Sequence, residues 1–329
     1  MITTGMAMNS NPAVSIIIPT YNRAHLIGRS VRSVLMQTYG DFEILVVDDA
    51  STDNTREVIH SFTDPRIRYV RLPENSGTSS VPRNYALGIA TGAYIAFQDS
   101  DDEWLPRKLE KQVNALESSP PEVGIVYTDM WRIEHGRRTY YATPSITPED
   151  GIIFKRALNF GIAGIGAATT LIRRTCFEKT GGFDVRLPTF IDMELFIRLS
   201  QCFYFYHIKE PLMRYYATSG STSSDRSSAV TARKMILDKY YDCIQGDRTV
   251  LANHYFGIGF DLSYIGNTKR GRKYFIKALR NNPFNPSILA ALLVSMLGHR
   301  VYYTFLTIFR TIKYPFVKKN RDTPDFTDD

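Results

Sequence analysis

The sequence predicts an α/β protein with a mostly parallel sheet, helices on both faces of that sheet, and an all-α region at its C-terminal end. Between residues 13 and 100, short apolar runs of strand length alternate with segments of helical periodicity. This alternation is typical of repeated β-α-β units, which place strands parallel to one another. From about residue 231 the pattern becomes wholly helical. A hydrophobic content of 43% is sufficient for a folded core.

The expected strands of the first part are continuous apolar runs, typical of strands buried on both faces. They are Val14–Ile18, Phe42–Val47, Ile67–Leu72 and Ala93–Phe97. The expected helices lie between them, at residues 23–35, Thr52–His60 and Val81–Ala90. In such sheets ligands bind at the carboxyl ends of the strands. Three of the four runs end in polar or acidic residues, so we expect the functional site at this edge.

The next part of the chain is less regular. We expect helices at Glu103–Leu116 and Ile191–Ser200. We expect strands at Val123–Thr128, Ala167–Ile172 and Phe203–Ile208. The serine-rich segment Thr218–Ser228 is expected to be a linker. Beyond it, the spacing of Tyr255, Gly259, Gly266, Phe275, Ala278 and Pro283 is that of one tetratricopeptide-like helical hairpin.

Charge and composition divide the chain further. Residues 226–321 carry seventeen Lys/Arg against four Asp/Glu, a balance of +13, while residues 1–225 carry −2. We therefore expect a flexible N-terminus (1–12), a main domain (13–225), a basic helical region (226–321) and an acidic tail (322–329). Three scattered cysteines indicate a reducing compartment and no zinc site. Since the first residues also lack the pattern of a signal peptide, a cytoplasmic location is expected.

The strand ends offer the groups that a nucleotide site needs. Tyr21 can stack on a base, and Asp49 can accept a hydrogen bond from one. Asp99, Asp101 and Asp102 place three carboxylates within four residues. Their mutual repulsion favours a hard divalent cation, Mg²⁺ or Mn²⁺, which usually bridges to substrate phosphates. Taken alone, these acids could instead cap the helix that follows them, and Asp48-Asp49 could form an Asx-type turn.

The order of four motifs is more specific than any one of them. They are VSIIIPTYNR at 14–23, VVDDAS at 46–51, RNYALGIATGAYIAFQDSDDEW at 83–104 and GGFD at 181–184. Together they resemble the family 2 glycosyltransferases with the GT-A (Rossmann-like) fold, over roughly residues 13–216. The resemblance implies inverting transfer of a sugar from a nucleoside-diphosphate sugar, with a divalent metal.

The same resemblance implies roles for particular residues. The base would be held by Pro19, Thr20, Tyr21 and Asp49, and Arg83 would lie near the diphosphate. Asp99 and Asp101 would belong to the donor site. Asp101, which would also contact the ribose, and Asp102 would bind the metal. Tyr215 and Tyr216 stand where the family commonly has Tyr-Arg, so a diphosphate contact there is not expected.

The resemblance also implies the catalytic base. Related enzymes place it in a Glu-Asp pair that opens the helix after GGFD, and here the pair is Ile191-Asp192. We expect Asp192 to take the proton from the acceptor hydroxyl. Glu194, two residues on, points in a different helical direction and is the lesser candidate. Taken alone, Asp192 could be only a helix N-cap.

The expected enzyme is non-processive, uses a UDP-sugar and acts on a saccharide or lipid-linked acceptor in cell-surface polysaccharide synthesis. Two alternatives stay open: a non-catalytic nucleotide-binding scaffold and a sugar-1-phosphate nucleotidyltransferase, although the first strand lacks the glycine-rich loop that the latter needs. The segment Val301–Phe316, apolar and flanked by Lys and Arg, is expected to dock on an anionic membrane surface. No nucleic-acid-binding module is recognisable, so nucleic acid is not an expected partner.

Overall fold

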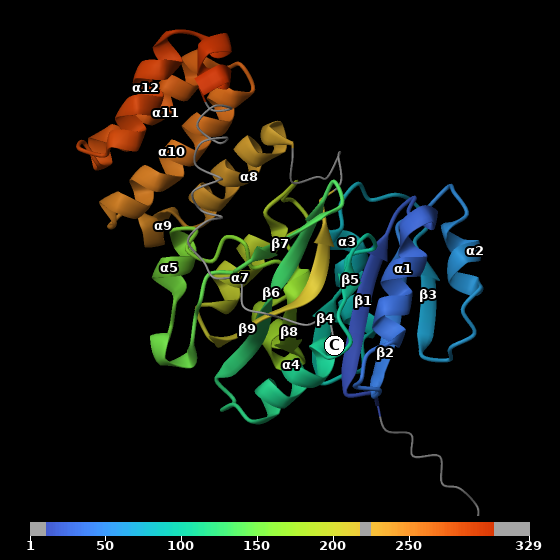
Figure 1. Cartoon of the computed structure of the whole chain (residues 1–329). Coiled ribbons are helices and arrows are strands. Elements are labelled where there is room, and N and C mark those ends of the chain that lie inside the picture. The colour runs from blue at the N-terminus through green and yellow to red at the C-terminus, as the bar shows by residue number, and fades with distance from the viewer. Residues whose placement is uncertain (1–10, 218–224, 306–329) are drawn as a thin grey trace, which may run out of the picture.

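One mixed sheet forms the centre of the molecule, in a computed structural model that describes residues 11–217 and 225–305 (Figure 1). Its strand order is β3-β2-β1-β4-β8-β6-β9-β5, and β7 pairs with β6 off this path. The strands are β1 (Val14–Thr20), β2 (Phe42–Asp48), β3 (Ile67–Arg71), β4 (Tyr94–Phe97), β5 (Glu103–Trp104), β6 (Val123–Glu134), β7 (Arg137–Tyr141), β8 (Thr170–Arg173) and β9 (Tyr204–Tyr216). The first four are parallel neighbours, and β8 joins β4 antiparallel. The predicted α/β class is therefore confirmed.

Helices cover both faces of the sheet. They are α1 (Ala24–Leu35), α2 (Thr55–His60), α3 (Ser80–Ile89), α4 (Lys108–Glu117), α5 (Phe154–Leu158), α6 (Arg174–Thr180) and α7 (Ile191–Leu199), with short 3₁₀ turns η1 (Pro148–Asp150) and η2 (Ala167–Thr169). Alternate residues of β1 and β2 enter two different cores. Ile16 and Ile18 pack with α1 and α4 on one face, while Ile17 lies with α3, α6 and α7 on the other. Burial on both faces explains why these strands are continuous apolar runs.

A lobe of helices packs beside the sheet (Figure 1). It contains α8 (Arg226–Lys239), α9 (Tyr241–Ile244), α10 (Arg248–Tyr264), α11 (Thr268–Asn281) and α12 (Pro286–Met296). The predicted hairpin is the pair α10–α11, which meets closely at Gly259, where a Cβ would lie 2.8 Å from the Phe275 ring. Val230 and Ile236 of α8 share a core with Phe196 of α7. The lobe and the sheet are thus joined by apolar packing.

Three sequence expectations were wrong in detail. Glu103 and Trp104 form strand β5 against β9, and the helix that follows begins at Lys108. Residues Ala167–Thr169 form a 3₁₀ turn rather than the start of a strand. The expected linker Thr218–Ser228 is already helical from Arg226, because Asp225 caps that helix by accepting a hydrogen bond from Ser227. Residues 218–224 and 306–316 of the expected linker and membrane segment lie outside the described residues.

Candidate active site

The carboxyl ends of β1, β2 and β4 bring the predicted donor residues to one edge of the sheet. Thr20 ends β1 opposite Asp48 in the parallel register, and the Asp49 amide donates to the Thr20 carbonyl at 2.8 Å. Pro19 and Thr20 are buried, whereas the Tyr21 ring is 44% exposed. An exposed ring beside a buried strand end is available for stacking on a base.

Asp49 is held by a loop that the sequence did not single out. Its carboxylate accepts hydrogen bonds from the Ser76 amide at 3.1 Å and from the Ser76 hydroxyl at 2.9 Å. Asn75 Nδ2 donates to the Asp49 carbonyl at 3.1 Å. The Asx-type turn that was expected as an alternative exists, but it is made by Asp48, whose Oδ1 accepts from the Ser51 amide at 2.8 Å.

Asp102 is the most deeply placed of the three clustered acids. It is 1% exposed, and its Oδ1 accepts a hydrogen bond from the Tyr216 amide at 2.9 Å, whereas its Oδ2 has no hydrogen-bond partner among the described residues. Burial and the neighbouring Asp99 raise the pKa of Asp102 well above its usual value, and they raise the pKa of Asp101 as well. The alternative that these acids cap the next helix is wrong, because α4 starts at Lys108 and has no side-chain cap.

Arg83 contacts both the predicted donor site and the predicted base. It lies on α3 and its side chain is 5% exposed. Its Nη2 lies 2.8 Å from Asp99 Oδ1, and its Nη1 lies 3.0 Å from Asp192 Oδ1. Burial alone would lower the pKa of Arg83, but the carboxylates of Asp192 and Asp99 outweigh it and raise this pKa. The Arg83 guanidinium therefore bridges the predicted base, Asp192, and Asp99 of the predicted donor site.

Asp192 is not a helix cap. It occupies the first turn of α7, whose N-cap is Phe190, and its Oδ2 accepts from the Ala167 amide at 2.9 Å. With its side chain 28% exposed, Asp192 retains access to solvent. Arg83 and Ala167 hold one oxygen each, so the carboxylate has a defined orientation and free lone pairs, as a general base requires.

Glu194 has a different environment. It is fully buried, and its carboxylate bonds Arg198, Lys239 and Tyr240. Burial would raise the pKa of Glu194, but Arg198 and Lys239 outweigh it and lower this pKa. Arg198 in turn donates to the carbonyl of Gly182 in GGFD and to that of Thr180 just before it. Glu194 thus has no access to substrate.

Several contacts of the site had no recognisable signal in the sequence. The Arg29 guanidinium lies 3.7 Å from the ring centre of Tyr216, whose hydroxyl donates to Glu103 at 2.6 Å. Asn84 bonds both the amide and the carbonyl of Phe183 at 2.8 Å and so fixes the GGFD turn against α3. Most of these contacts join residues 99 or more positions apart or use main-chain atoms, and neither kind leaves a local pattern.

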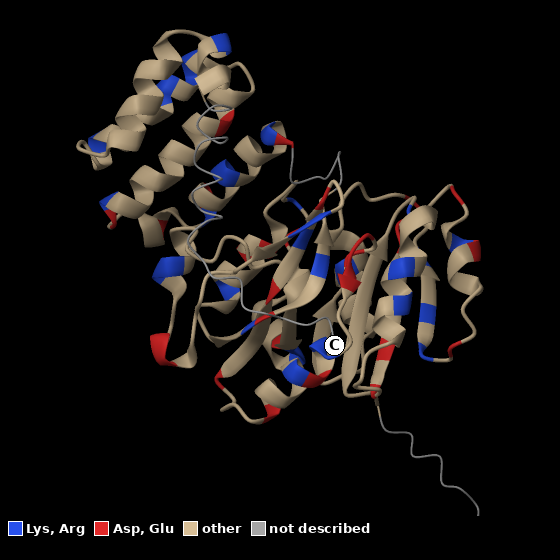
Figure 2. Cartoon of the chain, viewed as in Figure 1, with Lys and Arg blue, Asp and Glu red and all other residues tan. Residues whose placement is uncertain are grey.

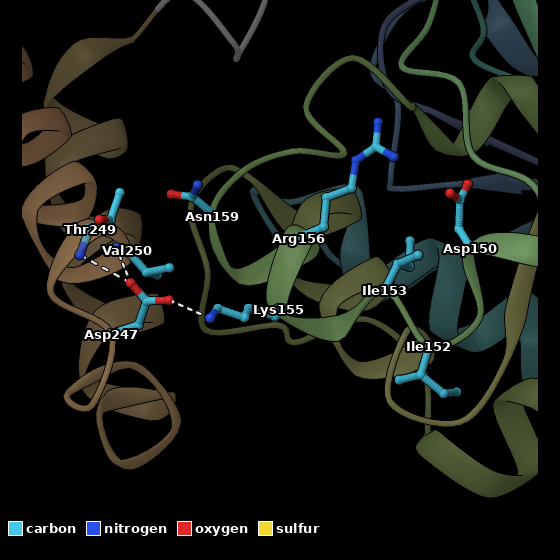
Figure 3. A pocket seen from close by; sticks show the side chains of 9 residues that line it. All are labelled: Asp150, Ile152, Ile153, Lys155, Arg156, Asn159, Asp247, Thr249 and Val250. Atoms are coloured by element: carbon cyan, nitrogen blue, oxygen red, sulfur yellow. Dashed lines mark hydrogen bonds and ion pairs between the residues drawn. The ribbon is translucent and has the colours of Figure 1, made fainter.

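The described residues contain neither a preformed metal cage nor a helix that could cross a membrane. No group of three or more His, Cys, Asp or Glu forms a ready-made metal cage there. Within the same residues, no helix is both long enough and apolar enough to cross a membrane. A hollow of about 510 Å³ lies away from the predicted residues, between α5 and the start of α10, where Lys155 pairs with Asp247 at 2.8 Å (Figure 3).

Comparisons with known proteins identify the family of the chain. Residues 15–181 match the family model described as glycosyl transferase family 2. The chain is 36% identical to the putative teichuronic acid biosynthesis glycosyltransferase TuaG of Bacillus subtilis, over 67% of this chain and 85% of that protein. It is 48% identical to the UDP-Glc:alpha-D-GlcNAc-diphosphoundecaprenol beta-1,3-glucosyltransferase WfgD of Escherichia coli, over 31% of this chain and 40% of that one.

Among solved structures, S. aureus TarS 1–349 in complex with UDP-GlcNAc has a similar fold. The TM-score is 0.62 at 18% identity, and the match covers 95% of this chain and 94% of TarS 1–349. Sequence and fold agree with the four ordered motifs, and the chain belongs to glycosyl transferase family 2.

Proposed function

We propose that this glycosyltransferase is inverting, depends on a divalent cation and is non-processive. It moves a hexosyl group from a UDP-sugar to a hydroxyl of a saccharide or lipid-linked acceptor during cell-surface polysaccharide synthesis. The proposal rests on one observation. The Arg83 guanidinium lies 3.0 Å from the carboxylate of Asp192 and 2.8 Å from that of Asp99, which belongs to the acidic cluster at the end of β4. A base and a donor site are therefore adjacent on one surface.

The donor site would use the residues at the strand ends. Tyr21 stacks on the base, Asp49 accepts from it, and Pro19 and Thr20 shape the floor of the pocket. Asp99 and Asp101 face the ribose and diphosphate, with Arg83 beside them. The buried Thr20 hydroxyl, which has no partner among the described residues, supports this arrangement, because a bound ligand would supply one.

The acidic cluster fits a divalent cation. Within the described part of the chain, Asp102 Oδ2 has no hydrogen-bond partner, and the pKa values of Asp101 and Asp102 are raised. A bound cation would relieve both features. Asp101 and Asp102 would hold Mg²⁺ or Mn²⁺. Two protein carboxylates suffice when substrate phosphates complete the coordination. When bound, the cation neutralises charge on the departing nucleoside diphosphate.

The protein's own part in the reaction is to orient and to deprotonate. Asp192 takes the proton of the acceptor hydroxyl as that oxygen bonds the anomeric carbon. The bond from this carbon to the diphosphate oxygen breaks in the same displacement, so the configuration inverts. Arg83 and the Ala167 amide keep the carboxylate oriented during this step.

The acceptor class is inferred from relatives. TuaG is named for teichuronic acid biosynthesis, and WfgD is named for transfer from UDP-Glc to a diphosphoundecaprenol-linked sugar. Both names describe cell-surface glycans. The name of WfgD and the UDP-GlcNAc bound in TarS both support a UDP-sugar donor.

The test is a screen of UDP-, GDP- and dTDP-sugars for Mn²⁺-dependent release of the free nucleotide, using the whole chain and its Asp192→Asn variant. We expect release from a UDP-sugar, abolished by EDTA and reduced in the variant. Nucleotide binding without release would indicate the scaffold alternative. Formation of a nucleotide sugar from a sugar 1-phosphate would indicate the nucleotidyltransferase alternative.

We also propose that the distal hairpin, residues 266–305, docks on the inner face of the cell membrane. It carries seven Lys/Arg and no Asp/Glu (Figure 2). Four apolar side chains with helical spacing on α12 and its C-cap are 47–67% exposed. They are Leu289, Leu293, Met296 and Leu297. Exposed apolar groups beside basic residues suit an anionic headgroup layer.

Vesicle co-sedimentation tests the docking. We expect binding to phosphatidylglycerol-containing vesicles that falls with added salt and falls in a Leu293→Ser, Leu297→Ser double variant. Met36→Ser is the matched control, because Met36 is 70% exposed at the end of α1, outside the hairpin. Failure of the whole chain to bind such vesicles at low salt would contradict the proposal.

A further inference from the structure

We propose that Arg233, on helix α8 of the C-terminal lobe, is a positioning residue that holds the start of α7 and thereby the carboxylate of Asp192. This inference rests on the proposed role of Asp192 as the base. It assigns the lobe a part in catalysis rather than in docking alone.

Phe190, the N-cap of α7, has a left-handed backbone with φ of 59°. Left-handed geometry is unfavourable for a bulky side chain and persists only where the surroundings hold it. The first turn of α7 has no side-chain cap that could do so. The direction in which α7 begins, and with it the position of Asp192 two residues on, therefore depends on what packs against Phe190.

Arg233 packs there. Its guanidinium lies 5.0 Å from the ring centre of Phe190 and 5.0 Å from that of Phe160. Phe160 is another left-handed residue, with φ of 58°. One cation from the lobe thus contacts both strained phenylalanines of the main domain, at cation-π distance.

The lobe holds Arg233 firmly. Its Nε bonds Asp261 of α10 at 2.7 Å, and Asp261 is fully buried. A Cβ on Gly257 would lie 2.7 Å from Arg233 Nη1, so glycine at this position of α10 gives the guanidinium its space. The residue that contacts Phe190 is therefore itself fixed by α10.

A second contact of α8 lies on the other side of Asp192. Lys239 Nζ lies 2.6 Å from the Glu194 carboxylate, and the hydroxyl of Tyr240, the C-cap of α8, donates to it at 2.9 Å. The two contacts bracket Asp192 along the chain, at Phe190 and at Glu194. Since Arg83 and the Ala167 amide can bond Asp192 only when α7 begins in this direction, the lobe sets the orientation of the base.

The chain offers a matched pair of variants. Arg233 and Arg226 both lie on α8 and both bond Asp261, at 2.7 Å and 3.1 Å. Only Arg233 contacts Phe190, whereas Arg226 lies over Tyr264. Arg233→Met and Arg226→Met each leave Asp261 with one arginine, so the two variants lose the same kind of ion pair but differ at the start of α7.

The experiment combines hydrogen exchange with kinetics. In Arg233→Met we expect faster amide exchange in the peptide 186–199 than in Arg226→Met or the wild type. With UDP-GlcNAc and Mn²⁺, we expect kcat for UDP release to fall about tenfold in Arg233→Met, with the donor KM within about twofold of wild type. Arg226→Met should retain most of its kcat.

The outcomes separate this inference from the proposed function. Equal exchange in the two variants, or a kcat that falls equally in both, would overturn the positioning role. If Asp192→Asn releases UDP at the wild-type rate, the proposed function fails instead. In that case the exchange data still decide whether Arg233 holds the start of α7.

Discussion

Replacing Asp192 by Asn tests the chemistry of the site most directly. Both partners of the Asp192 carboxylate are donors, the Arg83 guanidinium at 3.0 Å and the Ala167 amide at 2.9 Å. An asparagine amide accepts at its oxygen only, so one of these contacts is lost. We expect a stability cost of about 1–3 kcal/mol, because Arg83 keeps its second carboxylate, Asp99.

The effect on turnover should be larger. General-base catalysis contributes roughly 10²–10⁴ in rate, or about 3–5 kcal/mol of barrier. UDP binding should be nearly unchanged, since Asp192 lies across Arg83 from the donor acids. The matched control is Glu194→Gln on the same helix. It removes a fully buried charge from Arg198 and Lys239, and we expect it to cost about 3 kcal/mol of stability, with less than about a tenfold loss of turnover.

Two measurements on each variant test whether Asp192 or Glu194 is the base. They are steady-state UDP release and the free energy of unfolding in urea. Asp192→Asn should lose mainly activity, and Glu194→Gln mainly stability. If the two patterns are exchanged, Glu194 is the base and our assignment of the roles on α7 is wrong.

Three further predictions concern buried groups. Asp102→Asn should abolish transfer and the Mn²⁺-dependent part of UDP affinity in isothermal titration, whereas equal wild-type affinity with and without Mn²⁺ would contradict a bridging cation. Burial lowers the pKa of His254 from 6.5 to about 4, so the unfolded chain binds the extra proton between these values. Stability to urea should therefore fall by up to about 3 kcal/mol as the pH drops through this window. His254→Gln should flatten that dependence, and the control His25→Gln, at an exposed position, should not. Lys108 is fully buried, which lowers its pKa, and its ammonium nitrogen bonds Gln112. Lys108→Met should thus leave the melting temperature unchanged or raise it.

The parallel half of the sheet could be predicted from sequence because of where it lies. Strands buried on both faces require apolar side chains at every position, so β1 and β2 appear as continuous runs. Their predicted ends are within two residues of the observed ones. The two-residue strand β5 has no periodicity to detect, and Pro106 just beyond it is also typical of a first helical turn. Its pairing with Met213 and Arg214 depends on residues more than a hundred positions away.

The site, like the sheet, combines features that are local in sequence with contacts that are not. The acids at the strand ends could be predicted because a strand end and a run of carboxylates are both local features. The groups that orient these acids could not be predicted. The Tyr216 amide holds Asp102, and the Ala167 amide holds Asp192. Any residue type can supply a main-chain N–H group, so no side-chain pattern marks such a contact. Arg83 was expected to lie near the diphosphate, and its contact with Asp192 joins residues 109 positions apart.

The C-terminal lobe shows why charge pattern and structural role can differ. Its positive balance marks residues 226–321 as distinct, and the exposed cations of the distal hairpin account for much of that balance. The charge of the exposed residues does not indicate which side chains of the lobe are buried against the rest of the molecule. Val230 and Ile236 of α8 are buried in the same core as Phe196, and Lys239 satisfies a fully buried carboxylate of α7. A helix with these contacts cannot be removed without exposing apolar surface and leaving Glu194 with one fewer cation. Helix α8 is thus structurally part of the unit that carries Asp192. Helix α10 also contributes Ile258 and Leu262 to that core, whereas the buried apolar residues of α11 and α12 lie in a separate cluster with Ala252 of α10.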